Sequence, residues 1–126
     1  MVMIDDLRFD NQFTKSLPAD SQVGTARRQV EQACYSRVKP AAVGAPRLVA
    51  HSAEMFDLLG LESAEILRPG FVEVLAGNRV LAGMDPHAAC YGGHQFGNWA
   101  GQLGDGRAIA LGEVVDVNGR HQMLQL

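Results

Sequence analysis

The sequence predicts an α+β fold, in which helices and loops come before a glycine-rich stretch and antiparallel strands come after it. Three observations support this. Ser52 to Gly60 has helix-type apolar spacing with a capping residue at its start and a glycine at its end. Six of the 14 glycines lie between Gly92 and Gly106. After them, two apolar segments flank Asn118-Gly119, a strong signal for a β-hairpin.

The first part of the chain gives weaker signals. Asp5 to Asp20 is expected to be a loop that docks on the core through its apolar residues, Leu7, Phe9, Phe13 and Leu17. From Val23 to Val38 the apolar positions approximate a helical period. A strand is the alternative there, because Val30, Cys34, Tyr35 and Val38 also suit a pleated sheet.

The middle of the chain predicts short helices. Ser52 is a good N-cap because its hydroxyl accepts from an orphan backbone N–H of the first turn. Gly60 can take the left-handed conformation that closes that helix. A second short helix is expected from Ser63, and Pro69-Gly70 should stop or kink it before one further turn that ends at Gly77-Asn78.

The last part predicts a hairpin. Arg107 to Val117 is expected to be a strand, bulged at Gly112. Asn118-Gly119 favours a type I′ turn, and His121 to Leu126 is expected to be the return strand. The sequence stops inside this strand pattern, so we expect it to be the N-terminal piece of a longer protein.

Composition narrows the classes of protein. A chain of 126 residues suits one small domain, and an apolar share of 47% permits a packed core. A net charge of −3 argues against a nucleic-acid binder, and the chain lacks an apolar run long enough to span a membrane. Cys34 and Cys90 form no CxxC pattern, which predicts neither a disulfide framework nor a redox pair. A cytoplasmic protein is therefore expected.

The glycine-rich segment, residues 91–107, is the main candidate for function. Glycine costs the most entropy to order, so this many need a reason. One reason is the close approach of backbone N–H groups to a phosphate, with Arg107 adding a guanidinium suited to phosphate oxygens. The other interpretation is a structural turn, because neither GxxxxGK[ST] nor a proper GxGxxG is present.

The order of elements favours the phosphate interpretation. A glycine loop ending at Gly106, a strand, a tight hairpin and a second strand follow one another as in the small lobe of protein kinases. In kinases, a lysine on the strand after the hairpin contacts the nucleotide phosphates. The equivalent lysine would be expected around or just beyond Leu126.

The run from Tyr91 to Glu113, YGGHQFGNWAGQLGDGRAIALGE, closely resembles the selenoprotein O family of protein adenylyltransferases, which have a pseudokinase-like fold. The resemblance covers nearly the whole chain. Its other parts follow in family order: Phe13-Thr14, Leu17 to Asp20, Ala33 to Val38 with Pro40, Pro46 to Leu48, Leu58 to Leu61 and Leu75 to Asn78.

The resemblance implies a reaction and a binding site. Family members transfer AMP from ATP, with Mg²⁺, to hydroxyl side chains (Ser, Thr or Tyr) of other proteins and release pyrophosphate; the nucleotide is flipped relative to ordinary kinases. Gly104, Gly106 and Arg107 match the family's nucleotide-binding pattern. The family's phosphate-contacting lysine comes directly after the Leu-Gln-Leu pattern, and its metal ligands and catalytic aspartate lie further on. We therefore expect no catalytic or metal-binding residue in this chain, and no activity from it alone.

The resemblance thus implies one domain over residues 1–126: part of a kinase-like small lobe, with a nucleotide segment at 91–107 and a hairpin at 107–126. The expected partners are ATP and protein substrates, without nucleic acid or membrane.

Two alternatives belong to other classes. His87, Cys90 and His94 lie close in sequence and are residue types that bind zinc, although a fourth ligand is not evident. A non-catalytic interaction domain is the other alternative, because an open strand end at Leu126 can pair with another chain.

Three side chains in or just after the glycine segment are expected to have structural roles. Phe96 and Trp99 are expected to pin the glycine loop to the core rather than to stack on a base. Glu113 is expected to pair with Arg107 or Arg120 across the hairpin.

Overall fold

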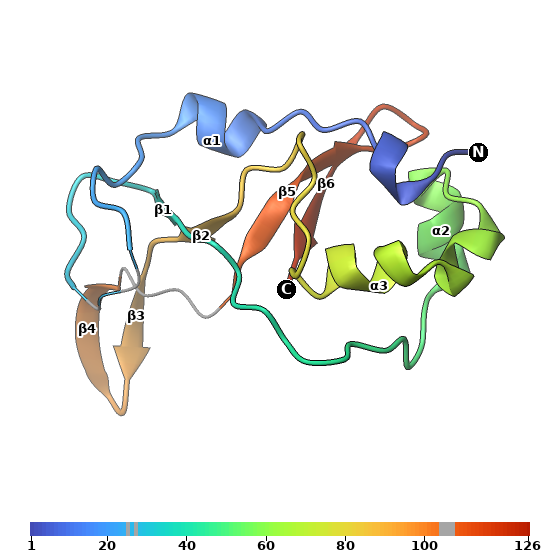
Figure 1. The fold of residues 1–126 in the computed structure, drawn as a ribbon. Helices are drawn as coiled ribbons and strands as arrows, with labels where there is room; N and C mark the ends of the chain where they lie inside the picture. The colour runs from blue at the N-terminus through green and yellow to red at the C-terminus, as the bar shows by residue number, and fades with distance from the viewer. Residues whose placement is uncertain (25, 27, 104–107) are drawn as a thin grey trace.

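A four-stranded antiparallel sheet forms the centre of the protein, with short helices at one end and a separate two-stranded hairpin at the other (Figure 1). The computed structural model describes the whole chain except residues 25, 27 and 104–107. Its helices and strands are, in chain order, η1 (Ile4–Asp6), α1 (Gln12–Ser16), β1 (Tyr35–Arg37), α2 (Ala53–Leu59), η2 (Ser63–Leu67), α3 (Pro69–Leu75), β2 (His87–Ala89), β3 (Tyr91–Gln95), β4 (Asn98–Leu103), β5 (Ala110–Val115) and β6 (His121–Gln125).

The sheet has the strand order β1-β2-β5-β6 and confirms the α+β class. Two of its strands, β1 and β2, precede the glycine-rich stretch, so the expectation that strands come only after it is wrong. The described residues between 23 and 38 form no helix; Tyr35–Arg37 is a strand that pairs with β2. Long-range packing selects the strand, because the Tyr35 ring is 1% exposed and its hydroxyl donates to the Thr14 carbonyl at 2.7 Å.

The middle helices agree with the sequence. The Ser52 hydroxyl accepts from the Met55 N–H at 3.2 Å and caps α2, and Gly60 ends this helix with a φ of +69°. The second helix is the 3-10 helix η2, which ends at Leu67. Pro69 stands in the first turn of α3, where a proline's missing N–H costs no helical hydrogen bond.

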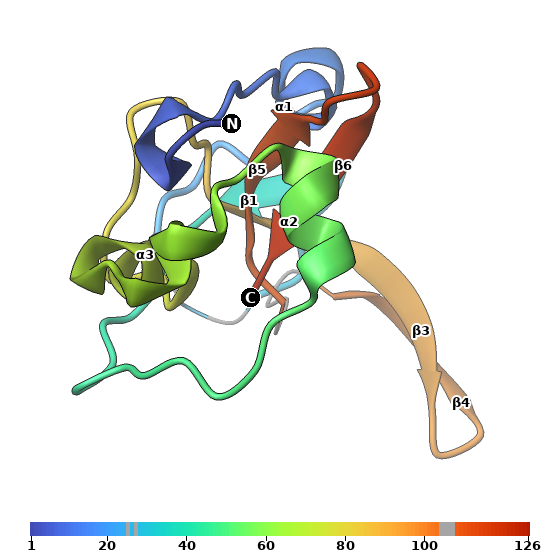
Figure 2. The same cartoon turned by 90° about the vertical axis from the view of Figure 1, so that its right-hand side faces the viewer.

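The opening segment is more ordered than a loop, since it contains η1 and α1. Leu7 is buried and Phe9 is half-buried, as expected, whereas Leu17 is 38% exposed. The main core lies between these segments, α2, α3 and the inner face of β5 (Figure 2). Its buried members are Ile4, Leu7, Phe56, Leu61, Phe71, Val74, Met84, Leu111 and Val114.

The C-terminal hairpin has the predicted bulge but not the predicted turn. The register of β5 and β6 shifts between Ala110 and Gly112. Gly119 has a φ of +76°, but Asn118 does not have the positive φ that a type I′ turn requires. The Asp116 carboxylate accepts from the N–H groups of Asn118 and Arg120 at 2.8 and 2.9 Å. These bonds stabilise a longer connection than a two-residue turn.

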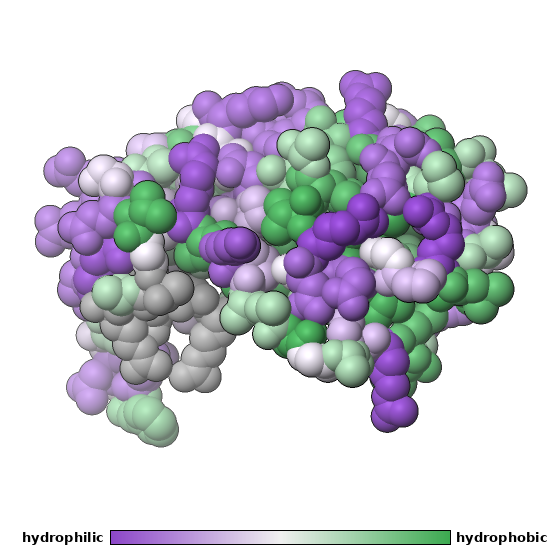
Figure 3. Space-filling view, viewed as in Figure 1, coloured by the Kyte–Doolittle hydropathy of each residue, from purple (hydrophilic) through white to green (hydrophobic). Residues whose placement is uncertain are grey.

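The surface divides by polarity. In the view of Figure 3, hydrophilic residues cover most of the molecule and hydrophobic residues gather toward the end that carries the helices. In the described part of the chain, no helix combines the length and apolar character that crossing a bilayer requires.

Candidate functional site

Part of the glycine-rich segment is a β-hairpin rather than a loop. Strands β3 and β4 pair with His94 opposite Trp99, and the turn between them is Phe96-Gly97, with φ values of +50° and +83°. The hairpin projects away from the four-stranded sheet in both views (Figures 1 and 2). A short, glycine-rich hairpin of this kind has little apolar surface with which to pack on the body.

The aromatic residues of this hairpin do not anchor it. Phe96 is fully exposed at the tip and Trp99 is 62% exposed, so the expected packing against the core is wrong. The Trp99 indole instead contacts the hairpin itself, edge-on to the His94 ring with centroids 5.3 Å apart. A Cβ at Gly92 would come within 2.5 Å of the indole, so a larger residue there would force the indole to move.

The nucleotide-binding residues that the sequence predicts come after this hairpin in the sequence. Gly104, Gly106 and Arg107 follow β4 directly and lie outside the residues that the structure describes. Their role stays a prediction.

A pocket of about 280 Å³ lies on one face of the sheet, over β2, β5 and β6. Its lining comes from α1, three strands of the sheet, the first residue of β3 and the residue that follows the undescribed segment. The lining residues are Phe13, His87, Ala89, Tyr91, Ala108, Ala110, Met123 and Gln125.

The pleat of the sheet explains why these side chains gather. Ala110 pairs with Gln125, so their side chains project from the same face of β5 and β6. Met123 lies two residues before Gln125 and therefore faces the same way. Small residues at 108 and 110 leave space above the sheet, which Gln125 borders with its polar amide.

His87 forms the polar floor of this pocket. It is 3% exposed and lies parallel to the Phe13 ring, with centroids 5.2 Å apart and planes 13° apart. Its Nδ1 is 2.9 Å from the Asp85 carbonyl oxygen. Because a carbonyl only accepts, this contact places the proton of a neutral imidazole on Nδ1 and leaves Nε2 as a hydrogen-bond acceptor.

An ion pair stands beside the pocket. Arg37 contacts both oxygens of Asp85 at 3.1 and 3.2 Å. Burial raises the pKa of Asp85, but the hydrogen bonds from Arg37 and Thr14 and the charge of Arg37 together outweigh it, and the pKa lies below its usual value. The negative charge at this edge of the sheet is thus already neutralised.

Glu113 holds α1 over this face of the sheet. Its Oε2 accepts from the Phe13 N–H at 2.6 Å, and its own N–H donates to the Asn11 side chain at 3.0 Å. The Asn11 side chain makes no capping hydrogen bond to α1, so the carboxylate of a distant strand satisfies an orphan N–H of the helix start. This contact takes the place of the expected pairing with Arg120, and His121 lies 3.8 Å from the other carboxylate oxygen; the alternative partner, Arg107, lies outside the described residues.

The structure does not support the metal-binding alternative. Within the described ranges, no three His, Cys, Asp or Glu side chains form a group that could hold a metal ion. His87 is buried against aromatic rings, whereas His94 stands exposed on the hairpin.

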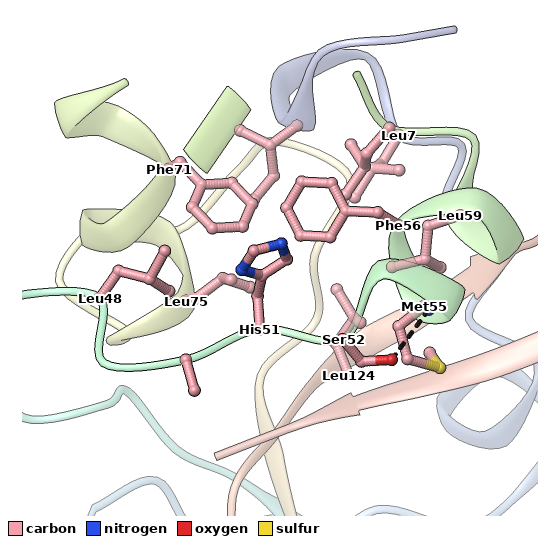
Figure 4. Close-up of a pocket in the computed structure, with 13 residues that line it drawn as sticks. Leu7, Leu48, His51, Ser52, Met55, Phe56, Leu59, Phe71, Leu75 and Leu124 are labelled. Atoms are coloured by element: carbon pink, nitrogen blue, oxygen red, sulfur yellow. Dashed lines mark hydrogen bonds between the residues drawn. The ribbon is translucent and has the colours of Figure 1, made fainter. Parts of the chain in front are cut away.

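A second pocket, of about 270 Å³, lies between α2, α3 and the loop before α2 (Figure 4). Leu48, Phe56, Phe71 and Leu124 point into it, and the His51 ring packs edge-on against Phe56 with centroids 5.2 Å apart. Its lining is almost wholly apolar and carries no charged side chain. The pocket therefore suits an apolar group and is not suited to a phosphate.

Comparison with known proteins identifies a matching family and several similar proteins. The model of the family described as protein adenylyltransferase SelO matches residues 19–126. A protein nucleotidyltransferase YdiU of Azoarcus sp. (strain BH72) is 62% identical over 120 residues, which cover 95% of this chain and 23% of the relative. Proteins of the same name from Rhodopirellula baltica and Methylobacillus flagellatus are 58% identical over 124 residues and 56% identical over 120 residues.

Each match covers nearly all of this chain but only a small part of the relative. The Rhodopirellula match covers 98% of this chain and the Methylobacillus match 95%, but each covers 23% of the relative. The chain thus spans about a quarter of the length of the curated relatives it matches. Because the family model matches most of its residues, the chain belongs to the protein adenylyltransferase SelO family.

Proposed function

We propose that this chain is the N-terminal part of an ATP-dependent protein adenylyltransferase, which transfers AMP from ATP to Ser, Thr or Tyr hydroxyls of other proteins. The single observation that carries the proposal is the family match over residues 19–126, which includes the complete glycine segment. The relatives are named protein nucleotidyltransferases, which agrees with the transfer of a nucleotide to a protein.

We propose that residues 1–126 form part of a kinase-like small lobe. The β5–β6 hairpin supports this, because it follows the glycine segment as the second and third strands of a kinase small lobe do. Met123 and Gln125 border the pocket beside that segment. A residue that continued β6 directly after Leu126 would face the same side as Gln125, where the phosphate-contacting lysine of the family pattern is expected.

In the proposed reaction this chain contributes to phosphate binding only. In the proposed reaction, a substrate hydroxyl oxygen attacks the α-phosphorus of ATP, and the bond to the departing pyrophosphate breaks. Gly104, Gly106 and Arg107 are proposed to bind the phosphates through backbone N–H groups and a guanidinium. Mg²⁺ would neutralise phosphate charge in such a reaction, and we assign it no ligand among the described residues.

The reaction is tested with the intact protein that contains this chain. Incubation with ATP labelled at the α-phosphate and a mixture of acceptor proteins should place label on protein, whereas ATP labelled at the γ-phosphate should place none. Label from γ-phosphate alone would show a kinase instead and would overturn the proposal. Residues 1–126 alone should incorporate no label; reproducible incorporation by them would show that the catalytic groups lie within this chain.

The nucleotide site is tested separately. Arg107→Ala in the intact protein should weaken ATP binding about tenfold or more, as expected for a lost charge-assisted contact to phosphate. Arg120→Ala is the matched control, because Arg120 lies on the exposed turn of the β5–β6 hairpin and should leave ATP affinity unchanged. Equal affinity of the Arg107→Ala variant and the unchanged protein would remove Arg107 from the site.

A further inference from the structure

The two cysteines of the chain lie opposite each other, although 55 residues separate them in sequence. Strands β1 and β2 pair with Tyr35 opposite Ala89 and Ser36 opposite Ala88. One step further along this register, Cys34 stands opposite Cys90. The Cys90 N–H donates to the Cys34 carbonyl at 2.8 Å, which confirms that the pairing continues to these residues.

A hydrogen bond at the other end of the β1–β2 pair follows the same register. The Val38 N–H donates to the Pro86 carbonyl at 3.3 Å, as the alternation of an antiparallel ladder requires. Residues directly opposite in such a ladder project their side chains from the same face of the sheet. The two thiols therefore share one face, the one opposite to the face on which Tyr35 and Ala89 lie.

The separation expected for residues opposed in this way suits a disulfide. Opposed residues joined by ladder hydrogen bonds have Cα atoms about 5.5 Å apart, within the range of about 4.4 to 6.8 Å seen in disulfides. Their Cβ atoms, at about 5 Å, must approach by up to about 1 Å. Both residues stand just outside the strands, and the Cys34 N–H bonds to Pro18 rather than to Cys90, so one hydrogen bond holds the pair.

Both thiols are free and partly exposed, so a small oxidant can reach them. We propose that Cys34 and Cys90 form a reversible dithiol–disulfide pair that reacts with peroxide. The proposal departs from the expectation from sequence, which had only the spacing of the two cysteines along the chain to judge.

The reaction balances in two steps. One thiolate sulfur attacks a peroxide oxygen; the S–O bond forms, the O–O bond breaks, and the sulfenic acid and water result once a proton is taken up. The second thiol sulfur then attacks the sulfenic sulfur; the S–S bond forms and the S–O bond breaks with loss of water. A dithiol reductant then reduces the disulfide to two thiols by exchange through a mixed disulfide, and is itself oxidised to a disulfide.

The bond would act on the root of the glycine-rich hairpin. Cys90 is the single residue between β2 and β3, and it therefore links the sheet to the hairpin. Tying it to Cys34 fixes the point from which the hairpin leaves the sheet. The pocket lies on the other face of this strand pair, where His87 and Ala89 project, so the bond does not fill it.

Peptide mapping of the intact protein tests the pair. After treatment with hydrogen peroxide and blocking of remaining thiols, trypsin should release peptide 29–37 joined to peptide 80–107, at the summed mass less two hydrogens. Dithiothreitol should separate them. Failure to find this joined peptide, with both cysteines recovered as thiols or as separate sulfinic acids, would overturn the proposal.

Two controls define the geometry. Mixing isotopically heavy and light protein before oxidation should give no joined peptide of mixed mass; a mixed product as abundant as the pure ones would show linkage between molecules and overturn the proposal. The double variant Cys90→Ser with Ala89→Cys keeps two thiols but turns one to the opposite face of β2. It should form no link to Cys34, and equal linkage would show that opposition in the sheet is not the cause.

Discussion

Replacing Glu113 by alanine should loosen the opening segment from the sheet. The carboxylate of Glu113 is 14% exposed and accepts from the Phe13 N–H at 2.6 Å. Alanine removes the acceptor and leaves an orphan N–H at the start of α1. A hydrogen bond to a charged group contributes about 1.5 to 3 kcal/mol, so we expect the free energy of unfolding to fall by about 2 kcal/mol. The His121 contact at 3.8 Å adds little, because it is partly exposed.

Two variants separate charge from hydrogen bonding. Glu113→Gln keeps an oxygen that can accept from Phe13 and loses the charge, so we expect a fall of about 1 kcal/mol. Glu31→Ala is the control, because Glu31 is an exposed glutamate in the described part of the chain and its loss should change stability by less than about 0.5 kcal/mol.

The assay has a global and a local readout. Urea unfolding at neutral pH measures the free energy of unfolding, and hydrogen exchange measures protection of the Phe13 amide. Both should fall in Glu113→Ala. If unfolding free energy and Phe13 protection both match those of the Glu31→Ala control, the carboxylate does not hold α1 on the sheet and the reasoning fails.

Three further predictions concern the elements around the core. Ser52→Ala should cost about 1 kcal/mol in urea unfolding, because the hydroxyl caps α2; a change below about 0.3 kcal/mol would contradict the cap. Gly119→Ala should lower the free energy of unfolding by about 1 to 2 kcal/mol, because a φ of +76° strains an L side chain even in open space. Asn118→Ala should cost less; a larger cost for Asn118→Ala than for Gly119→Ala would favour the type I′ turn instead. The pKa of Asp116 is held below its usual value by the hydrogen bond from the Gln122 side chain and those from the Arg120 and Asn118 N–H groups. The ionised form of Asp116 therefore stabilises the fold at pH above the ordinary pKa, and this stabilisation is lost as the pH falls through the lowered pKa. In Asp116→Asn the free energy of unfolding should fall less steeply with decreasing pH than in the unchanged protein. An equal fall in both proteins would assign the acid sensitivity to other groups.

The features that sequence predicted correctly depend on neighbours within a few residues. The cap at Ser52, the helix end at Gly60 and the break between η2 and α3 at Pro69 follow from hydrogen bonding and backbone freedom inside one turn. The bulge beside Gly112 belongs to the same group, because a glycine in an apolar strand marks irregular pairing.

The predictions that failed depended on packing between distant segments. The helix expected from Val23 to Val38 is wrong, and the strand alternative holds at Tyr35–Arg37, because the Tyr35 ring is buried between α1 and the sheet. Phe96 and Trp99 are expected to pin the glycine loop to the core, but a hairpin that pairs with itself carries them outward. The turn after β5 was mistaken because Asp116 supplies acceptors that a dipeptide signal does not report.

The candidate site divides in the same way. A recognisable glycine run is a property of residue order, so sequence alone pointed to Gly104, Gly106 and Arg107, and their role stays a prediction. The pocket lined by Tyr91, Ala108 and the sheet, the carboxylate of Glu113 at the start of α1, and the opposition of Cys34 and Cys90 appear only in three dimensions. The physical reason is that strand pairing brings together residues tens of positions apart, and periodicity along the chain carries no record of which strand will pair with which.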